Sequence, residues 1–124
     1  MTVAIRRQEL RLSLGEAGFR SMRSREGDEG WRKEEEKLNA LQEKFNLIAE
    51  NLNTQNAEPI DIPAIFGDVL TEVAGLERKN NKIPCFVLLN RVLIALGSDV
   101  RYQGSVPLLN DALTRVQALA LQAS

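Results

Sequence analysis

The stretch that decides the fold is residues 31–53, WRKEEEKLNALQEKFNLIAENLN, because its apolar residues recur at helical spacing. Four of them stand seven residues apart, and two more follow three residues behind the second and third, which is the pattern of one helix face. We predict a long amphipathic helix over residues 29–53, about 37 Å long at 1.5 Å per residue. Its apolar stripe, called the seam below, consists of Trp31, Leu38, Leu41, Phe45, Ile48 and Leu52.

The seam is narrow, with two apolar residues in seven, as in a coiled coil. Glu35 and Gln42 flank it on one side and Lys37 and Lys44 on the other, while Glu34 interrupts it after its first residue. So short a seam makes a marginal helix alone. A narrow stripe also offers little width to an intrachain bundle, so we predict that the helix associates with a second copy of the chain, a dimer being the simplest closed assembly.

The sequence after residue 53 predicts three more helices. Asp61 two residues before Pro63 is a capped helix opening, and the residues that follow repeat at spacings of three and four. Pro84 predicts the start of a helix that is apolar nearly all round, as a central helix is. Pro107 predicts the start of the last helix. We therefore expect an all-α fold, a small helical bundle with one long coiled-coil-like helix, and the three further helices span residues 62–79, 84–96 and 106–121.

The N-terminal residues differ from the rest in charge. Residues 1–25 hold six arginines against two glutamates, a local charge of +4, whereas residues 26–58 hold nine carboxylates against four basic residues, a charge of −5. Gly27 and Gly30 stand at the junction, where glycines among charged residues indicate a hinge. We predict an Arg-rich N-terminal arm over residues 1–27 and a helical domain over residues 28–124.

The sequence of this arm allows two interpretations of its conformation. Leu10, Leu12 and Leu14 alternate with polar residues as in a half-buried strand, whereas Leu10, Leu14 and Ala17 together with Val3 also fit one helix face. A short strand would have no sheet to join in a helical chain. We therefore favour a helix, or order that is induced by binding.

The residue inventory excludes several chemistries. Histidine is absent and Cys85 is the only cysteine, so one chain cannot assemble a Ser-His-Asp or Cys-His catalytic set, a Cys/His zinc site or an intrachain disulfide. The carboxylates of residues 34–36 point about 100° apart on a helix, which indicates a solvated face. Cys85 among apolar neighbours is expected to be buried and structural. We expect no enzymatic activity, no catalytic residues, no metal and no cofactor.

The expected function is that of a non-enzymatic, oligomeric adaptor or regulatory protein acting through helical interfaces with protein partners. Trp31 is either an anchor for such a partner or a core residue. The alternative is a nucleic-acid-binding protein, similar to compact viral accessory proteins, in which a helical dimer presents two arginine arms, because guanidinium groups suit phosphates. The arginines of this arm are Arg6, Arg7, Arg11, Arg20, Arg23 and Arg25.

The apolar runs do not favour a membrane protein. The longest, residues 85–96, includes Asn90 and Arg91 and falls short of the roughly 17 residues that a membrane helix needs. Residues 1–25 lack the apolar centre of a secretory signal. We expect no membrane contact and a reducing compartment, the cytosol or the nucleus.

Overall fold

The computed structural model describes residues 9–19, 29–54 and 56–122, and these residues form helices and loops without a strand. The all-α prediction is confirmed. The elements in chain order are a π-helical turn η1 (Gly15–Phe19), the helices α2 (Glu29–Asn53), α3 (Ile62–Ala74) and α4 (Lys79–Gly97), a 3-10 turn η2 (Gln103–Ser105) and the helix α5 (Val106–Gln122).

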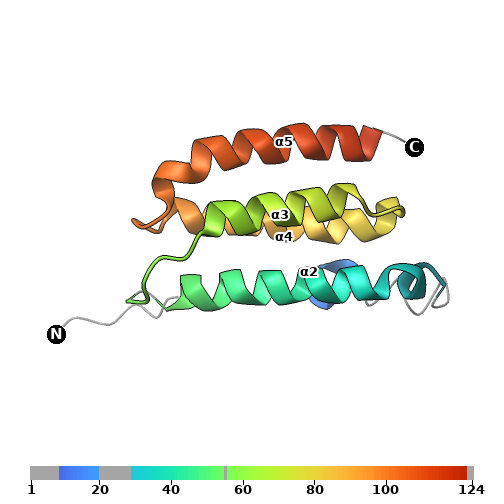
Figure 1. Ribbon diagram of the computed structural model, residues 1–124, viewed down its shortest axis with the longest axis horizontal. Helices are drawn as coiled ribbons and strands as arrows, with labels where there is room; N and C mark the ends of the chain where they lie inside the picture. Colours follow the sequence, from blue (N-terminus) through green and yellow to red (C-terminus); the bar gives the residue numbers. More distant parts are fainter. Residues whose placement is uncertain (1–8, 20–28, 55, 123–124) are drawn as a thin grey trace.

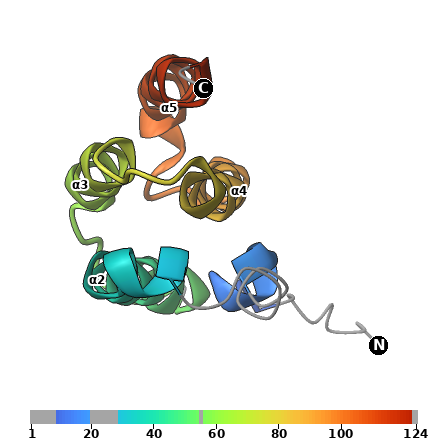
Figure 2. The same ribbon diagram turned by 90° about the vertical axis from the view of Figure 1, so that its right-hand side faces the viewer.

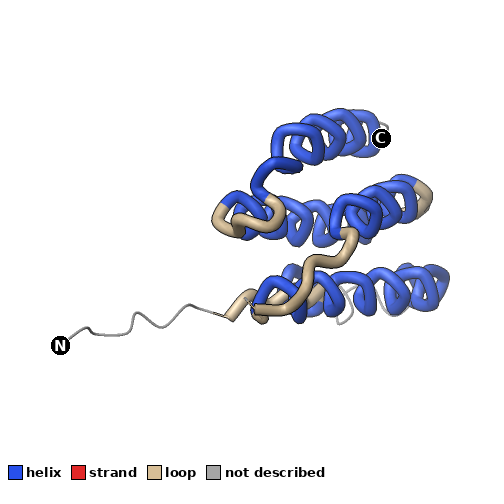
Figure 3. Tube along the Cα trace, turned by 60° about the vertical axis from the view of Figure 1, so that its left-hand side comes forward, coloured by secondary structure: helices blue, strands red, loops and turns tan. Residues whose placement is uncertain are grey.

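The four long helices run alternately in opposite directions, as the colour order along the chain shows in Figure 1. Seen end-on, α3 and α4 lie side by side in a central layer, with α5 on one side of it and α2 on the other (Figure 2). Residues 9–19 lie beside α2 and under α4, where a closed bundle would hold another helix. The tube in Figure 3 shows short loops after α3 and after α4 and a longer one between α2 and α3.

The limits of α2 and the start of α3 agree with the sequence prediction. α2 spans Glu29–Asn53 as predicted. Asp61 caps α3, since its Oδ1 accepts a hydrogen bond from the amide of Ala64 at 3.2 Å, and Pro63 occupies the first turn. Pro63 suits this place because the amide it lacks would have no partner inside the helix.

The turn between α3 and α4 lies earlier than the sequence predicts. α3 ends at Ala74 rather than near Lys79, and the N–H of Gly75, which follows it, bonds to the carbonyl of Thr71 at 3.1 Å. α4 begins at Lys79, so Pro84 lies inside the helix and not at its start. At this position, beyond the first turn, the proline lacks the N–H that would bond to the carbonyl of Asn80, and its ring crowds that carbonyl.

One buried apolar cluster joins all the long helices and the described part of the arm. Phe45 of α2, Phe66 of α3 and Phe86 of α4 are among its largest members. Leu12 and Leu14 belong to the same cluster. These two residues of the predicted arm therefore pack with the helical domain.

Candidate functional site

The seam of α2 is an internal packing face in this structure. Its five described side chains are at most 6% exposed, because α2 packs on α3 and α4. The five described seam side chains therefore face the chain's own core, and the assignment of an oligomer interface to the seam stays a prediction. The residues concerned are Leu38, Leu41, Phe45, Ile48 and Leu52; the side chain of Trp31 lies outside the described part.

Three of the exposed apolar side chains in the described residues lie on α4. Ile83, Val87 and Ile94 are exposed, Ile94 by 74%. Their spacings of four and seven residues place them on one face of the helix, opposite the buried face that includes Cys85 and Val92. The sequence had predicted α4 as a central helix. It does contact α2, α3, α5 and η1, but the described residues leave this stripe, called the α4 stripe below, uncovered.

The charges of α4 have a single sign. The helix carries Lys79, Lys82 and Arg91 and has no carboxylate in its sequence. Lys79 and Arg91 stand four residues before Ile83 and four residues after Val87, so they continue the row of the α4 stripe. A surface of this kind, apolar with basic borders, is complementary to an apolar surface with acidic borders.

The arm is held on α2 by two side-chain amides that bond to its backbone. Asn53 accepts a hydrogen bond from the amide of Leu10 at 2.8 Å and donates one to the carbonyl of the same residue at 3.0 Å. Gln42 accepts from the amide of Leu14 at 2.8 Å and donates to the carbonyl of Leu12 at 2.6 Å. Each amide therefore satisfies both a donor and an acceptor of the arm, as a neighbouring strand would.

Burial along this segment alternates as in a strand. Leu12 and Leu14 are buried and Leu10 is half-buried, whereas Arg11 is exposed. The strand-like reading of these leucines thus describes their burial, and the helix that we favoured is absent over residues 9–13. We call the surface made by Gln42, Asn53 and the pockets of Leu12 and Leu14 the arm seat.

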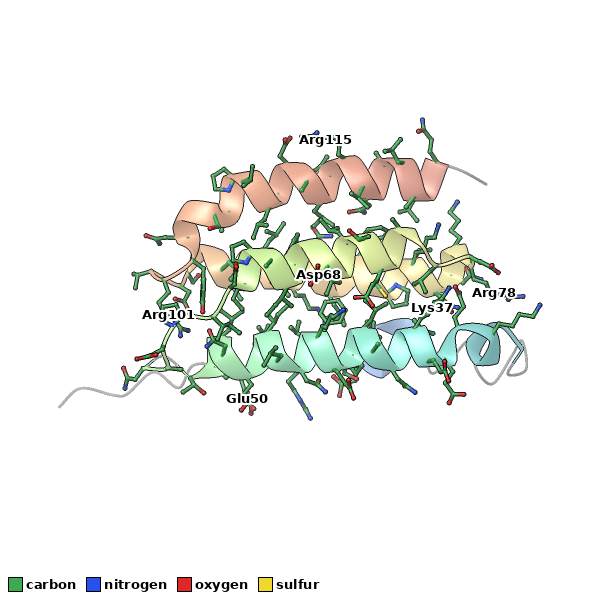
Figure 4. The ribbon with its side chains drawn as sticks, in the orientation of Figure 1. Lys37, Glu50, Asp68, Arg78, Arg101 and Arg115 are labelled. Carbon is green, nitrogen blue, oxygen red and sulfur yellow. The ribbon has the colours of Figure 1, made fainter. Side chains whose placement is uncertain are left out.

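A groove of about 430 Å³ runs beside the arm seat, between the arm and the last turns of α2. Its lining mixes apolar, polar and charged side chains. Glu50 lines it and points away from α3 and α4 (Figure 4). The lining residues are Glu9, Leu10, Arg11, Leu12, Ser13, Asn46, Ala49, Glu50, Asn53 and Thr54.

Glu34 is not part of a solvated face. It is 3% exposed, whereas Glu35 and Glu36 are exposed as predicted. Its carboxylate accepts hydrogen bonds from the amides of Glu77 at 2.7 Å and Arg78 at 3.3 Å. A third bond, 2.7 Å long, comes from the side chain of Asn81. The first turns of α2 thus fix the turn that leads into α4, and this role explains a carboxylate at a seam position.

Cys85 is fully buried on the inner face of α4, in agreement with the sequence prediction. Burial raises the pKa of its thiol from 9.0 to about 12, and the charge of Glu34 adds to this effect. Its Sγ lies 3.4 Å from the carbonyl of Asn81 as a donor. A buried thiol that stays protonated is a poor nucleophile.

At the opposite end of the bundle, a polar cluster ties the loop after α4 to the loop after α2. The guanidinium of Arg101 binds both carboxylate oxygens of Asp99, at 3.0 and 2.8 Å, and two backbone carbonyls. The hydroxyl of Tyr102 donates to Oδ1 of Asn51 and accepts from the amide of Ile60. Figure 4 shows Arg101 and Arg78 at the two opposite ends. With these partners in place, the cluster serves to fix loops.

Most of the residues that are predicted to bind nucleic acid lie outside the described residues. Arg11 is the exception, and its side chain is exposed on the arm. The other members, Arg6, Arg7, Arg20, Arg23 and Arg25, lie outside the described residues.

The residues that the structure describes contain no group of three acidic or cysteine side chains arranged to hold a metal ion. None of their helices has both the length and the apolar character needed to cross a membrane. Comparisons of the chain with protein-family models, with curated proteins and with solved structures find no match.

Proposed function

We propose that this chain is a non-enzymatic adaptor or regulatory protein that binds a partner protein through the α4 stripe. The observation that carries the proposal is the exposure of Ile83, Val87 and Ile94 on one face of a helix whose other faces are packed. Burying such aliphatic side chains is favourable by about 25 cal/mol per Å² of apolar surface. Grouped apolar exposure of this kind is typical of binding surfaces.

The partner that fits best is an amphipathic helix with acidic residues beside its apolar face. A helix presents apolar residues at spacings of three, four and seven, which match the spacings along the α4 stripe. Lys79 and Arg91 supply the complementary charges in the same row. The exposed leucines of α5, Leu108 and Leu119, lack such a border, since Asp111 and Arg115 between them form an ion pair.

Site-specific photo-crosslinking in the producing cell tests this proposal. A photoreactive residue at position 94 is expected to trap discrete protein adducts, and the same residue at position 119, on α5, is the matched control because Leu119 is similarly exposed. Val87→Glu should remove the adducts at position 94, and Lys79→Glu with Arg91→Glu should weaken them. Identical adducts from both positions, or none from position 94, would refute the proposal.

Nucleic-acid binding by the arginine arm is the second candidate, favoured by the exposure of Arg11. Phosphate contacts give a log affinity that falls with log salt by about 0.7 to 0.9 per contact. Replacing the six arm arginines by glutamine should flatten that dependence in shift assays with RNA and DNA. An unchanged salt dependence would remove this candidate and leave the protein-binding one in place.

A further inference from the structure

We propose that Asn90 sets the register of the partner helix on the α4 stripe, because it stands within that stripe and needs a polar side chain opposite it. This role rests on the proposed function of the stripe. It narrows the partner from any acidic amphipathic helix to one that carries a hydrogen-bonding side chain, such as Asn or Gln, at one position of its apolar face.

Asn90 lies in the gap of seven residues inside the α4 stripe. It stands three residues after Val87 and four before Ile94, and it is exposed as they are. With Ile83 four residues before Val87, the row follows spacings of four, three and four, which is the spacing of a coiled-coil seam. A helix that packs along this row therefore covers Asn90 together with the apolar side chains.

The carboxamide of Asn90 makes one hydrogen bond to its own helix. Its Nδ2 donates to the carbonyl oxygen of Phe86 at 2.9 Å. A side-chain amide has two N–H donors and an oxygen that accepts two bonds, so one N–H and Oδ1 stay free of partners among the described residues. In the uncovered stripe these two groups bond to water.

Covering the stripe takes the free donor and acceptor of Asn90 out of water. A partner helix that is purely apolar leaves both groups unpaired and loses affinity, whereas a carboxamide opposite them can satisfy both. One asparagine in an otherwise apolar seam fixes the register of two helices for this reason. Alignments that place an apolar side chain over Asn90 are therefore disfavoured.

The basic borders of the stripe fix the register less sharply. Lys79 and Arg91 attract acidic residues over about 8 to 10 Å at physiological salt, which is longer than one helical turn. The carboxamide of Asn90 needs its partner atom within about 3 Å. The charges therefore attract an acidic helix to α4, and Asn90 selects one alignment along it.

A cycle of two designed peptides and two chains tests this role by fluorescence anisotropy. Both peptides have the 19-residue length of α4, with Leu at the seam positions and Glu beside them. They differ only at the central seam position, which is Asn in one peptide and Leu in the other. The two chains are the unaltered protein and Asn90→Leu, in which the new residue favours a helix.

The unaltered chain should favour the Asn peptide, and Asn90→Leu should favour the Leu peptide. We expect the ratio of the two affinities to change by about tenfold or more between the chains, as for side chains in direct contact. Asn39→Leu is the matched control, since Asn39 is exposed on α2 rather than on α4. It should leave the ratio of the unaltered chain unchanged.

Cross-linking measures the register itself. A photoreactive residue at position 94 should attach to one site of the Asn peptide in the unaltered chain. In Asn90→Leu the same peptide has no fixed alignment, so adducts should appear at sites that are a heptad apart. A role of Asn90 in folding alone would change neither the affinity ratio nor this pattern.

Circular dichroism of each chain should show an unchanged helical content, because the substituted positions are exposed. Equal affinity ratios in the two chains, or the same single adduct site in both, would overturn the role of Asn90 and leave the proposed function in place. Failure of both peptides to bind either chain would contradict the acidic-helix partner itself, and the role of Asn90 would fall with it.

Discussion

Helices α2 and α4 use their apolar residues in opposite ways. α2 has a narrow stripe, and every described residue of it is buried. α4 is apolar nearly all round, and it leaves Ile83, Val87 and Ile94 in contact with solvent. The narrow stripe of α2 predicts a helix that contacts a second copy of the chain. The broad apolar surface of α4 predicts a helix that is enclosed by its neighbours.

The difference shows that the width of an apolar stripe does not fix how much of it is covered. Coverage depends on how many neighbours the helix meets. The narrow apolar stripe of α2 is covered by α3, α4 and the arm. Covering the outer face of α4 would need one more helix than the described residues contain. Stripe width therefore predicts how much packing a helix can use, and the neighbours determine how much it receives.

The largest expected effect is at the centre of the α2 seam. Phe45→Ala should lower the free energy of unfolding by about 3 to 5 kcal/mol, because it leaves a cavity among fully buried side chains. Leu47→Ala, two residues along and on an exposed position, is the control and should change it by under about 0.5 kcal/mol. Urea denaturation followed by circular dichroism measures both. Equal effects would show that the seam is not an internal face.

Leu41→Glu with Phe45→Glu should unfold the chain, because both side chains are fully buried and two carboxylates would replace them.

A smaller effect is expected where α2 fixes the start of α4. Glu34→Ala removes the acceptor of two backbone amides and the Asn81 side chain, which should cost about 1 to 3 kcal/mol. Glu35→Ala alters an exposed neighbour and should be close to neutral. The same denaturation assay applies. A neutral Glu34→Ala would show that the turn before α4 is held by other contacts.

The inner face of α4 should show a pH dependence through Cys85. Its pKa is about 12 in the folded chain against 9.0 for an ordinary thiol, so below pH 9 both states hold the proton and stability is unaffected. Above pH 9 the unfolded thiol ionises first, and the free energy of unfolding falls by up to about 1.4 kcal/mol per pH unit.

Cys85→Ala isolates this effect. The difference in unfolding free energy between the unaltered chain and the variant should be constant from pH 7 to 8 and should shift in favour of the variant above pH 9. Urea titrations at each pH measure it. A difference that stays constant up to pH 10.5 would contradict the assignment of a buried, neutral thiol.

The smallest effect on stability is expected on the outer face of α4. Ile94→Gln should change the unfolding free energy by under about 0.5 kcal/mol, because the side chain is already in water. Leu93→Gln, one residue away and buried, should cost several times more, since it buries an amide. A large loss of stability for Ile94→Gln would mean that the α4 stripe is covered.

The sequence predicts α2 well because one helical spacing runs along it from Trp31 to Leu52, with Glu34 as the one polar residue at a seam position. It misplaces the turn between α3 and α4, because Pro84 resembles a helix start and the contact that fixes the true start comes from Glu34, more than forty residues earlier in the chain. The position of Glu34 in the sequence is the one sign of this contact. A carboxylate at a seam position is either a packing defect or a buried hydrogen-bond acceptor.

The arm teaches a related point. The alternation of Leu10, Leu12 and Leu14 predicts a half-buried strand, and the absence of a sheet led us to prefer a helix. In the structure Gln42 and Asn53 take the place of a neighbouring strand by bonding to the arm backbone. Single-residue patterns do not reveal this, because the two amides stand eleven residues apart on a helix and look like ordinary surface residues.

Thiol footprinting at two matched positions tests the central claim, that the seam is internal and the α4 stripe is free. In a Cys85→Ala background, Ile48→Cys and Ile94→Cys are each reacted with a charged thiol reagent at micromolar protein concentration. Ile48 is fully buried and Ile94 is largely exposed. We expect the thiol at position 94 to react at nearly the rate of an unfolded peptide, and the thiol at position 48 to react at least a hundredfold more slowly. Fast reaction at position 48, or protection at position 94 equal to that at position 48, would contradict the account.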